Sequence, residues 1–197
     1  MRTVIAALIA LSAACSAEIA PGTYLCGPNG SCPEDLACDG ETNTCVFPSQ
    51  VLPFTCGSTT EVEPNDSLAG AQPMRSLTCV SQPAEVRGCG QDLDRQDWYR
   101  FEVPANCTAV GVTSRLRFPL AFEALELELV SSTGQTIASS GPCSFDEQDD
   151  GDVQRCLDQE LTPGGVYALR VSRTGEGTCS GMCAYNHYTL TLQLETP

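Results

Sequence analysis

The sequence predicts an all-β protein, an antiparallel β-sandwich or jelly roll preceded by a small disulfide-rich module. Two observations predict the sandwich. Apolar and polar residues alternate with a period of two in several short runs after residue 68, the pattern of strands with one buried face and one face in water. Turn-forming residues separate these runs, and no stretch of ten or more residues shows a helical period with caps.

The first fourteen residues indicate an export signal. Arg2 supplies a positive charge, and the apolar run Val4 to Leu11 is too short to span a bilayer. Small residues then precede Cys15. The stretch that ends at Cys15 resembles a bacterial lipoprotein signal, whose cysteine is lipidated after cleavage. Ordinary signal cleavage after Ala17 is the alternative. We expect an exported protein, lipid-anchored to the cell envelope through Cys15 or else soluble in the periplasm or secreted.

The charge of the chain is strongly acidic. Its 197 residues include 25 Asp and Glu and ten arginines, with no lysine, for a net charge of −15. Removal of Arg2 leaves nine arginines against 25 acids, a net charge of −16. This charge excludes nucleic-acid binding and adsorption on anionic lipid, both of which need a basic surface. The expected partner is an extracellular protein or polysaccharide, and the only expected membrane contact is the lipid on Cys15.

Twelve cysteines follow Cys15, and in an exported chain they indicate disulfides rather than thiolate metal ligands. The first four have the spacing C-x5-C-x5-C-x6-C with turn formers between them. So short a segment cannot bury a useful core, so residues 15–50 are predicted to be a tether and a knot held by two disulfides. Three pairings are open, and we expect the crossed one, Cys26 with Cys38 and Cys32 with Cys45.

Eight more cysteines lie from Cys56 onward. The expected pairs are Cys143 with Cys156, Cys179 with Cys183, Cys79 with Cys89, and, by remainder, Cys56 with Cys107. Between Cys143 and Cys156, the stretch Asp146 to Asp152 holds five carboxylates in seven residues. It lacks the spacing of an EF-hand. A second calcium loop is one interpretation, and we expect instead a solvated hairpin tip closed by the disulfide.

Residues 51–60 are predicted to be a linker, rich in proline and polar residues, and residues 61–197 the sandwich. Turns are expected at Ser132 to Gly134 and at Pro163 to Gly165. Four strands are evident from the alternation, and their inward residues are Tyr99, Phe101 and Val103; Leu125, Leu127 and Leu129; Tyr167, Leu169 and Val171; and Tyr188, Leu190, Leu192 and Leu194.

The acidic segment Glu61-Val62-Glu63-Pro64-Asn65-Asp66 is the clearest candidate site. Pro64 favours an extended Glu63, so Glu61, Glu63 and Asn65 share a face, and Asp66 can fold in from a turn. Carboxylate and amide oxygens suit calcium, which takes about 6–8 oxygen ligands. Aspartates before the next strand could complete the shell, and the candidate ligands are Glu61, Glu63, Asn65, Asp66, Asp94 and Asp97. The alternative is a solvated acidic linker.

Six motifs in order resemble the bacterial pre-peptidase C-terminal (PPC) domain, from about Thr59 to Leu194. They are Glu61-x-Glu63-Pro64-Asn65-Asp66, Ala71-x-Pro73, Asp94-x-x-Asp97-Trp98-Tyr99-Arg100-Phe101-x-Val103, Leu125-x-Leu127-x-Leu129, Leu161-Thr162-Pro163-Gly164-Gly165-x-Tyr167-x-Leu169-x-Val171 and Tyr188-x-Leu190-x-Leu192. The resemblance implies a β-sandwich with an accessory, non-catalytic role. It also implies structural calcium at the acidic segment, with one further ligand among Asp92, Asp94 and Asp97. The eight cysteines depart from the family, so disulfides could take the place of the metal.

No enzyme is expected. His187 is the single histidine and is predicted to face outward from the last strand. The sequence has no Gly-x-Ser-x-Gly motif, so it offers no serine nucleophile of that kind for the histidine to activate. Trp98 is also predicted to face outward, either as a platform for a sugar or peptide or as cover for a sheet edge. The sequence therefore predicts a calcium-stabilised binding or adaptor module. The alternative is a cystine-stapled inhibitor of an extracellular hydrolase that uses the loops of the knot.

Overall fold

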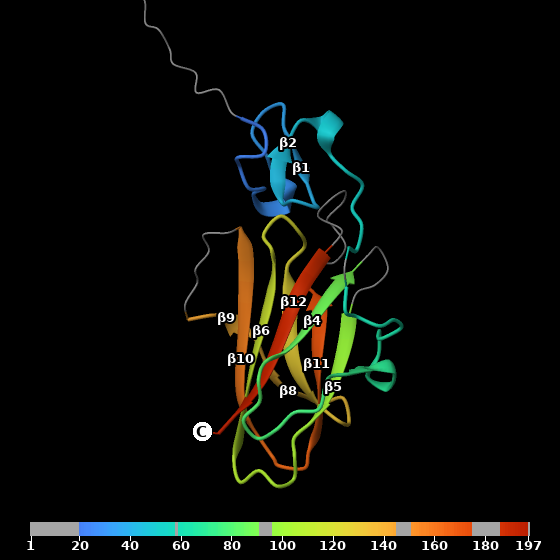
Figure 1. Cartoon of the computed structure of the whole chain (residues 1–197), viewed down its shortest axis with the longest axis vertical. Helices are drawn as coiled ribbons and strands as arrows, with labels where there is room; N and C mark the ends of the chain where they lie inside the picture. Colours follow the sequence, from blue (N-terminus) through green and yellow to red (C-terminus); the bar gives the residue numbers. More distant parts are fainter. Residues whose placement is uncertain (1–19, 58, 91–95, 145–150, 175–185, 197) are drawn as a thin grey trace, which may run out of the picture.

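The computed structural model describes residues 20–57, 59–90, 96–144, 151–174 and 186–196. These residues form a small knot at one end of a β-sandwich (Figure 1). The described chain contains no α-helix, which confirms the predicted all-β class, and its three 3-10 helices are η1 (Pro28–Gly30), η2 (Pro48–Gln50) and η3 (Leu68–Gly70). Within those ranges, no helix has the length and apolarity needed to cross a membrane.

The sandwich consists of two five-stranded sheets. The first has the order β4-β12-β6-β10-β9 and the second β3-β5-β11-β7-β8. Neighbouring strands are antiparallel as predicted, except that β3 pairs with β5 in parallel over two residues. The strands are β3 (Gln72–Pro73), β4 (Ala84–Gly90), β5 (Gln96–Glu102), β6 (Val110–Pro119), β7 (Leu125–Ser131), β8 (Thr136–Ser139), β9 (Gly141–Pro142), β10 (Asp152–Leu161), β11 (Val166–Arg173) and β12 (Asn186–Glu195).

The four strands evident from the sequence are β5, β7, β11 and β12, and their inward residues pack in one core as predicted. Along β12, Leu190, Leu192 and Leu194 are fully buried, and each such side chain contributes about 1.5–3 kcal/mol of burial. The long strands β6 and β10 show a weaker alternation. Ser114 is an inward residue of β6, and the polar Arg155 is a partly buried residue of β10.

Trp98 does not provide the exposed platform that one interpretation required. It faces away from the main core, but only 7% of it is exposed, in a small cluster with Ala71, Val130 and Ala168 against which Leu68 packs. The Arg170 guanidinium lies 5.2 Å from the ring centroid, within the range of a cation–π contact. The tryptophan therefore covers the outer face of the second sheet.

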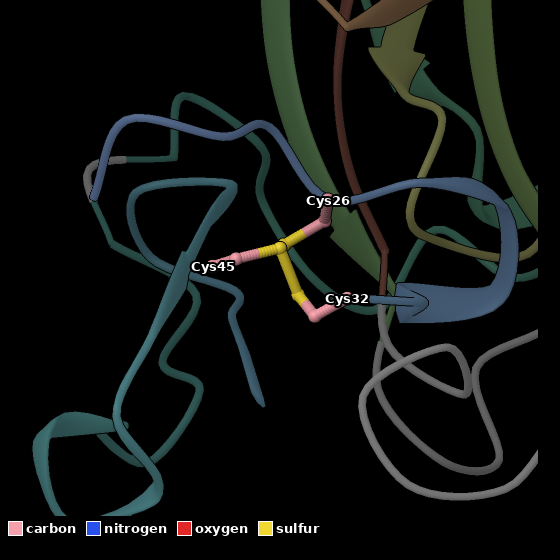
Figure 2. A group of neighbouring side chains, drawn as sticks. All are labelled: Cys26, Cys32 and Cys45. Atoms are coloured by element: carbon pink, nitrogen blue, oxygen red, sulfur yellow. A yellow bond between two sulfur atoms is a disulfide. The ribbon is translucent and has the colours of Figure 1, made fainter. Parts of the chain in front are cut away.

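The knot pairs its cysteines as predicted, Cys26 with Cys38 and Cys32 with Cys45. The hairpin of β1 (Ala37–Asp39) and β2 (Thr44–Val46) carries Cys38 directly opposite Cys45. Figure 2 shows the Cys32–Cys45 bond with the Cys26 sulfur beside it. Because all these sulfurs are in disulfides, this group cannot supply thiolates to a metal.

Two predicted pairs in the sandwich were wrong. Cys79 does not pair with Cys89 nor Cys56 with Cys107: the bonds are Cys56–Cys89 and Cys79–Cys107. Strand β4 starts after Cys79 and carries Cys89 near its far end, and an extended strand rises about 3.3 Å per residue, which separates the two. The predicted Cys143–Cys156 bond is present, while Cys179 and Cys183 lie outside the described residues.

The knot packs against the end of the sandwich through an apolar cluster. Phe122 lies in one cluster with the buried knot cysteines, and Phe54 packs against it. The imidazole of His187 stacks on Phe54, with ring centroids 6.0 Å apart, and meets Phe122 edge-on at 5.0 Å. His187 thus faces away from the main core, as predicted, but the knot and linker partly cover it.

Burial lowers the pKa of His187 below its ordinary value of 6.5, against the opposing charges of Asp152 and Glu41. A lowered pKa means that the unfolded chain binds the proton more readily than the folded one. The stabilisation from the neutral imidazole is therefore present above pH 6.5 and is lost as the pH falls below that value.

We therefore predict that replacing the imidazole with a ring that cannot titrate removes one component of acid sensitivity. In His187→Phe, the aromatic contacts with Phe54 and Phe122 are retained. The loss of Tm between about pH 7.5 and pH 5 should be smaller than in the wild type. Scanning calorimetry of both proteins at each pH measures the difference. Equal losses in the two proteins would contradict the prediction.

Candidate metal centre

The acidic segment, residues 61–66, is held between the two sheets. The N–H groups of Thr60 and Glu61 donate to the carbonyl of Arg87 on β4, at 3.0 and 3.2 Å. The Cys56–Cys89 disulfide fastens the preceding residues to the same strand. On the other side, Trp98 N–H of β5 donates to the carbonyl of Asn65 at 3.0 Å. The segment therefore crosses from one sheet to the other.

Three carboxylates converge at this crossing. Oxygens of Glu61, Glu63 and Asp97 all lie within 4.8 Å of one another. Cys89 N–H donates to Glu61 Oε2 at 2.9 Å, and Asn65 N–H donates to Glu63 Oε2 at 2.9 Å. Backbone donors thus orient two of the three carboxylates.

Asn65 is fully buried beside these carboxylates. Its Nδ2 donates to Glu61 Oε1 at 3.0 Å, which sets the orientation of the amide. Its Oδ1 is buried and has no hydrogen-bond partner among the described residues. A buried amide oxygen without a partner costs about 1–3 kcal/mol. A cation among the neighbouring carboxylates would supply the missing partner.

Two tyrosines complete the buried side of the centre. Tyr99 of β5 donates its hydroxyl to Glu61 Oε1 at 2.5 Å, and Tyr188 of β12 donates to Asp97 Oδ2 at 2.5 Å. The two hydroxyl oxygens are 2.6 Å apart. Burial, followed by the charges of Glu61 and Asp97, raises the pKa of both tyrosines. Both hydroxyls therefore remain protonated, and they link the two sheets beneath the carboxylates.

The crowding of negative charge is evident at Glu63. Partial desolvation of the carboxylate is the main reason that its pKa is raised, and the charges of Glu61 and Asp66 add to it, while the hydrogen bond from Asn65 N–H opposes it. A raised pKa indicates that the carboxylate is destabilised by its surroundings. Because Glu63 is largely exposed, a cation from solvent could reach the carboxylate and relieve the repulsion.

The structure brings together four of the six predicted ligands, Glu61, Glu63, Asn65 and Asp97. Asp66 is exposed and lies outside the group of three carboxylates, and Asp94 lies outside the described residues. Sequence reasoning treated Tyr99 and Tyr188 only as core residues. Their hydroxyl groups were the sequence signal for a role in the site, because a tyrosine at an inward position needs a polar partner.

Comparisons with known proteins give structural matches of low sequence identity. No family model and no curated protein matches the sequence. The pre-peptidase C-terminal domain of a collagenase from Bacillus anthracis has 15% identity and a TM-score of 0.43 over 68% of this chain and 99% of that one. Aeromonas hydrophila PliG, a periplasmic inhibitor of g-type lysozyme, has 13% identity and a TM-score of 0.38 over 63% of this chain and 95% of that one.

A family GH115 4-O-methyl-α-glucuronidase has 10% identity and a TM-score of 0.25 over 75% of this chain and 18% of that one. The first of the three structures is a PPC domain, the family that the sequence motifs resemble. At these identities and TM-scores, neither family membership nor a function transfers to this chain.

A glycine makes room for the tyrosine pair. Gly88 of β4 lies directly opposite Tyr188 of β12. A Cβ at Gly88 would overlap the Tyr188 ring and its hydroxyl. Since Tyr188 bonds Asp97 from this position, the absence of a side chain at Gly88 is part of how the centre is built.

We predict that Gly88→Ala destabilises the protein by about 1–3 kcal/mol, the usual cost of overpacking, because the Tyr188 ring must move. Gly111→Ala is the matched strand control, since its Cβ would find its nearest atom, the carbonyl oxygen of Glu195, at 3.9 Å. Denaturant unfolding of both variants measures the free energy of unfolding. Similar values for the two would show that the Tyr188 ring can move without cost.

Proposed function

We propose that the protein is a non-enzymatic binding or adaptor module, exported or anchored to the envelope through Cys15, in which calcium orders the acidic segment. One observation carries the proposal: the fully buried Asn65 has an amide oxygen with no described hydrogen-bond partner, beside the cluster of Glu61, Glu63 and Asp97.

The donor set favours a hard cation such as calcium over zinc. Zinc prefers thiolate and imidazole ligands, whereas the site offers only carboxylate and amide oxygens. The residues that would hold calcium are Glu61, Glu63, Asn65 and Asp97. Since calcium takes about 6–8 oxygens, bidentate carboxylates, backbone carbonyls or water would supply the remainder. When bound, the ion would neutralise repelling charges.

A binding role agrees with the rest of the centre better than catalysis does. Asn65, Asp97, Tyr99 and Tyr188 are all buried, so a substrate has no path to the inner part of the cluster. Both tyrosines have a raised pKa, which suits fixed donors rather than groups that exchange protons near neutral pH. The centre thus supports a structural ion, which would hold the segment and both sheets in one arrangement.

We predict that calcium raises the Tm of the oxidised mature chain. Calcium at about 100 times its dissociation constant should add roughly 2.7 kcal/mol to the free energy of unfolding, a rise of about 5–10 °C for a chain of this size. A chelator should reverse the rise, and calorimetric titration should give one site. Glu63→Gln should abolish the rise, because it removes a ligand that has no contact with the tyrosines.

The control for this experiment is Glu34→Gln, which removes an exposed carboxylate from the knot and should retain the full calcium response. Terbium provides a second readout, since Tyr99 lies next to Glu61 and should sensitise the luminescence of a lanthanide at this site. No calcium-dependent rise in Tm in the wild type, with the fold intact, would overturn the calcium proposal.

A second candidate is an inhibitor of an extracellular hydrolase, and one observation favours it. The described knot and linker, residues 20–57, carry four acidic and no cationic residues. They also expose four large apolar side chains, each between 43% and 57% exposed, namely Tyr24, Leu25, Phe47 and Leu52. Aromatic and apolar anchors within an acidic surface suit docking to a basic protein.

For this candidate we predict that the oxidised protein inhibits at least one basic secreted hydrolase in a panel of glycosidases and peptidases. The double variant Phe47→Ala/Leu52→Ala should weaken inhibition by roughly tenfold or more, since buried anchors dominate interface energy. Ile137→Ala removes an exposed apolar residue of β8 and should leave inhibition unchanged. An equal loss in both variants, or no inhibition across the panel, would exclude inhibition through the knot.

A further inference from the structure

The second sheet has a groove at its edge that is separate from the metal centre. Its volume is about 540 Å³, within the range of pockets that bind ligands. Met74, Leu77, Phe101 and Val166 provide its apolar walls. Figure 1 shows β5 running away from the knot, so the groove at the end of β5 lies towards the far end of the sandwich.

The groove lies where β5 loses its outer neighbour. Strand β3 pairs with β5 only at Tyr99 and Arg100, and the last contact is Met74 N–H donating to the carbonyl of Arg100 at 2.8 Å. Because alternate residues of a strand turn their backbone groups to the same edge, the N–H and C=O of Glu102 face this edge too. No strand of the described chain pairs with them there.

The groove also gathers positive charge in a strongly acidic protein. Arg75 and Arg100 line it together with a single acid, Glu102, whereas the whole chain has a net charge of −15. The Nη2 of Arg75 donates to the carbonyls of Gln82 and Pro83, at 2.5 and 2.8 Å, which holds its guanidinium in place. Arg100 is exposed and has no side-chain hydrogen bond or ion pair with the described residues.

We propose that this groove is the partner-binding surface of the module and that its partner is an extended polypeptide carrying a carboxylate. The partner adds as a short strand where β3 ends, exchanging main-chain hydrogen bonds with Glu102, and it places the carboxylate against Arg75 and Arg100. Such strand addition draws affinity from the backbone and specificity from alternate side-chain pockets. The inference rests on the proposed role as a binding module.

A polypeptide fits this surface better than a polysaccharide does. Main-chain donors and acceptors at a sheet edge match another main chain in spacing. Sugar rings instead stack on exposed aromatic faces, and the one tryptophan is covered, while Phe101 is buried. The two arginines favour a carboxylate in particular, since the planar guanidinium matches its geometry. That carboxylate is either an Asp or Glu side chain or a free C-terminus.

The test begins with displayed peptide libraries selected on the full oxidised protein, one with free C-termini and one with the C-termini fused. We predict enrichment of peptides that combine a carboxylate with apolar residues. Enrichment only in the free library identifies the C-terminus as the carboxylate, and enrichment in both identifies a side chain. Enrichment of peptides without any carboxylate, or of none at all, would overturn the proposal.

Binding of an enriched peptide to two charge-reversal variants then locates the site. Arg100→Glu should weaken binding about tenfold or more, by removing a charge-assisted contact. Arg115→Glu is the matched control: Arg115 is an exposed arginine of β6 whose side chain also has no described partner. It changes the net charge equally and should alter binding less than about twofold. Equal effects would place the peptide elsewhere.

N-methylation of the peptide tests the strand pairing. Methyl groups on the amides that face Glu102 should abolish binding, while methyl groups on the intervening amides should be tolerated, because only alternate amides face one neighbour in a sheet. Equal tolerance at all positions would overturn strand addition. The change in Tm with calcium does not depend on peptide binding. Failure of the groove proposal and failure of the calcium proposal can therefore be distinguished.

Discussion

The structure depends on one chain of buried hydrogen bonds between the two sheets. It runs from Glu61 through the hydroxyls of Tyr99 and Tyr188 to Asp97. The tyrosines stand on strands of different sheets, β5 and β12, so the chain fixes how the sheets meet at this end. The two outer links are strong because they are shielded from water and end on carboxylates, and the two hydroxyl oxygens between them lie 2.6 Å apart. The acidic segment is the piece that this chain attaches to both sheets.

The strands were predictable from the sequence where one face is buried, because apolar and polar residues then alternate with a period of two. Leu125 and Leu127 illustrate this, since both are fully or almost fully buried and each is followed by a glutamate that is less buried. The alternation is less regular where an inward position is polar, as at Ser114 and Arg155. Disulfide partners within the sandwich were not predictable, because they depend on which segments lie side by side. Cys56 and Cys89, 33 positions apart in the sequence, meet where Thr60 also bonds to β4.

The candidate site was predictable in part for the same reason. The spacing of Glu61, Glu63 and Asn65 is local, and an extended chain places them on one face whatever the rest of the fold does. Asp97 joins them because two segments 30 or more residues apart meet in the fold. The order of the motifs suggests that these segments meet, but the spacing of the residues cannot show it. The tyrosine hydroxyls and the room left by Gly88 appear only once β4, β5 and β12 have been placed.

The disulfides and the proposed metal ion would act on the same segment in different ways. The Cys56–Cys89 bond holds the backbone beside β4, and Cys89 N–H then orients the Glu61 carboxylate. A covalent bond limits position, but it leaves the charges of Glu61, Glu63 and Asp97 in place, and it gives the buried Asn65 oxygen no partner. Those two costs are electrostatic, and a cation bound among the carboxylates would offset both of them. Near neutral pH the ion that we propose would therefore offset costs that the disulfides leave in place.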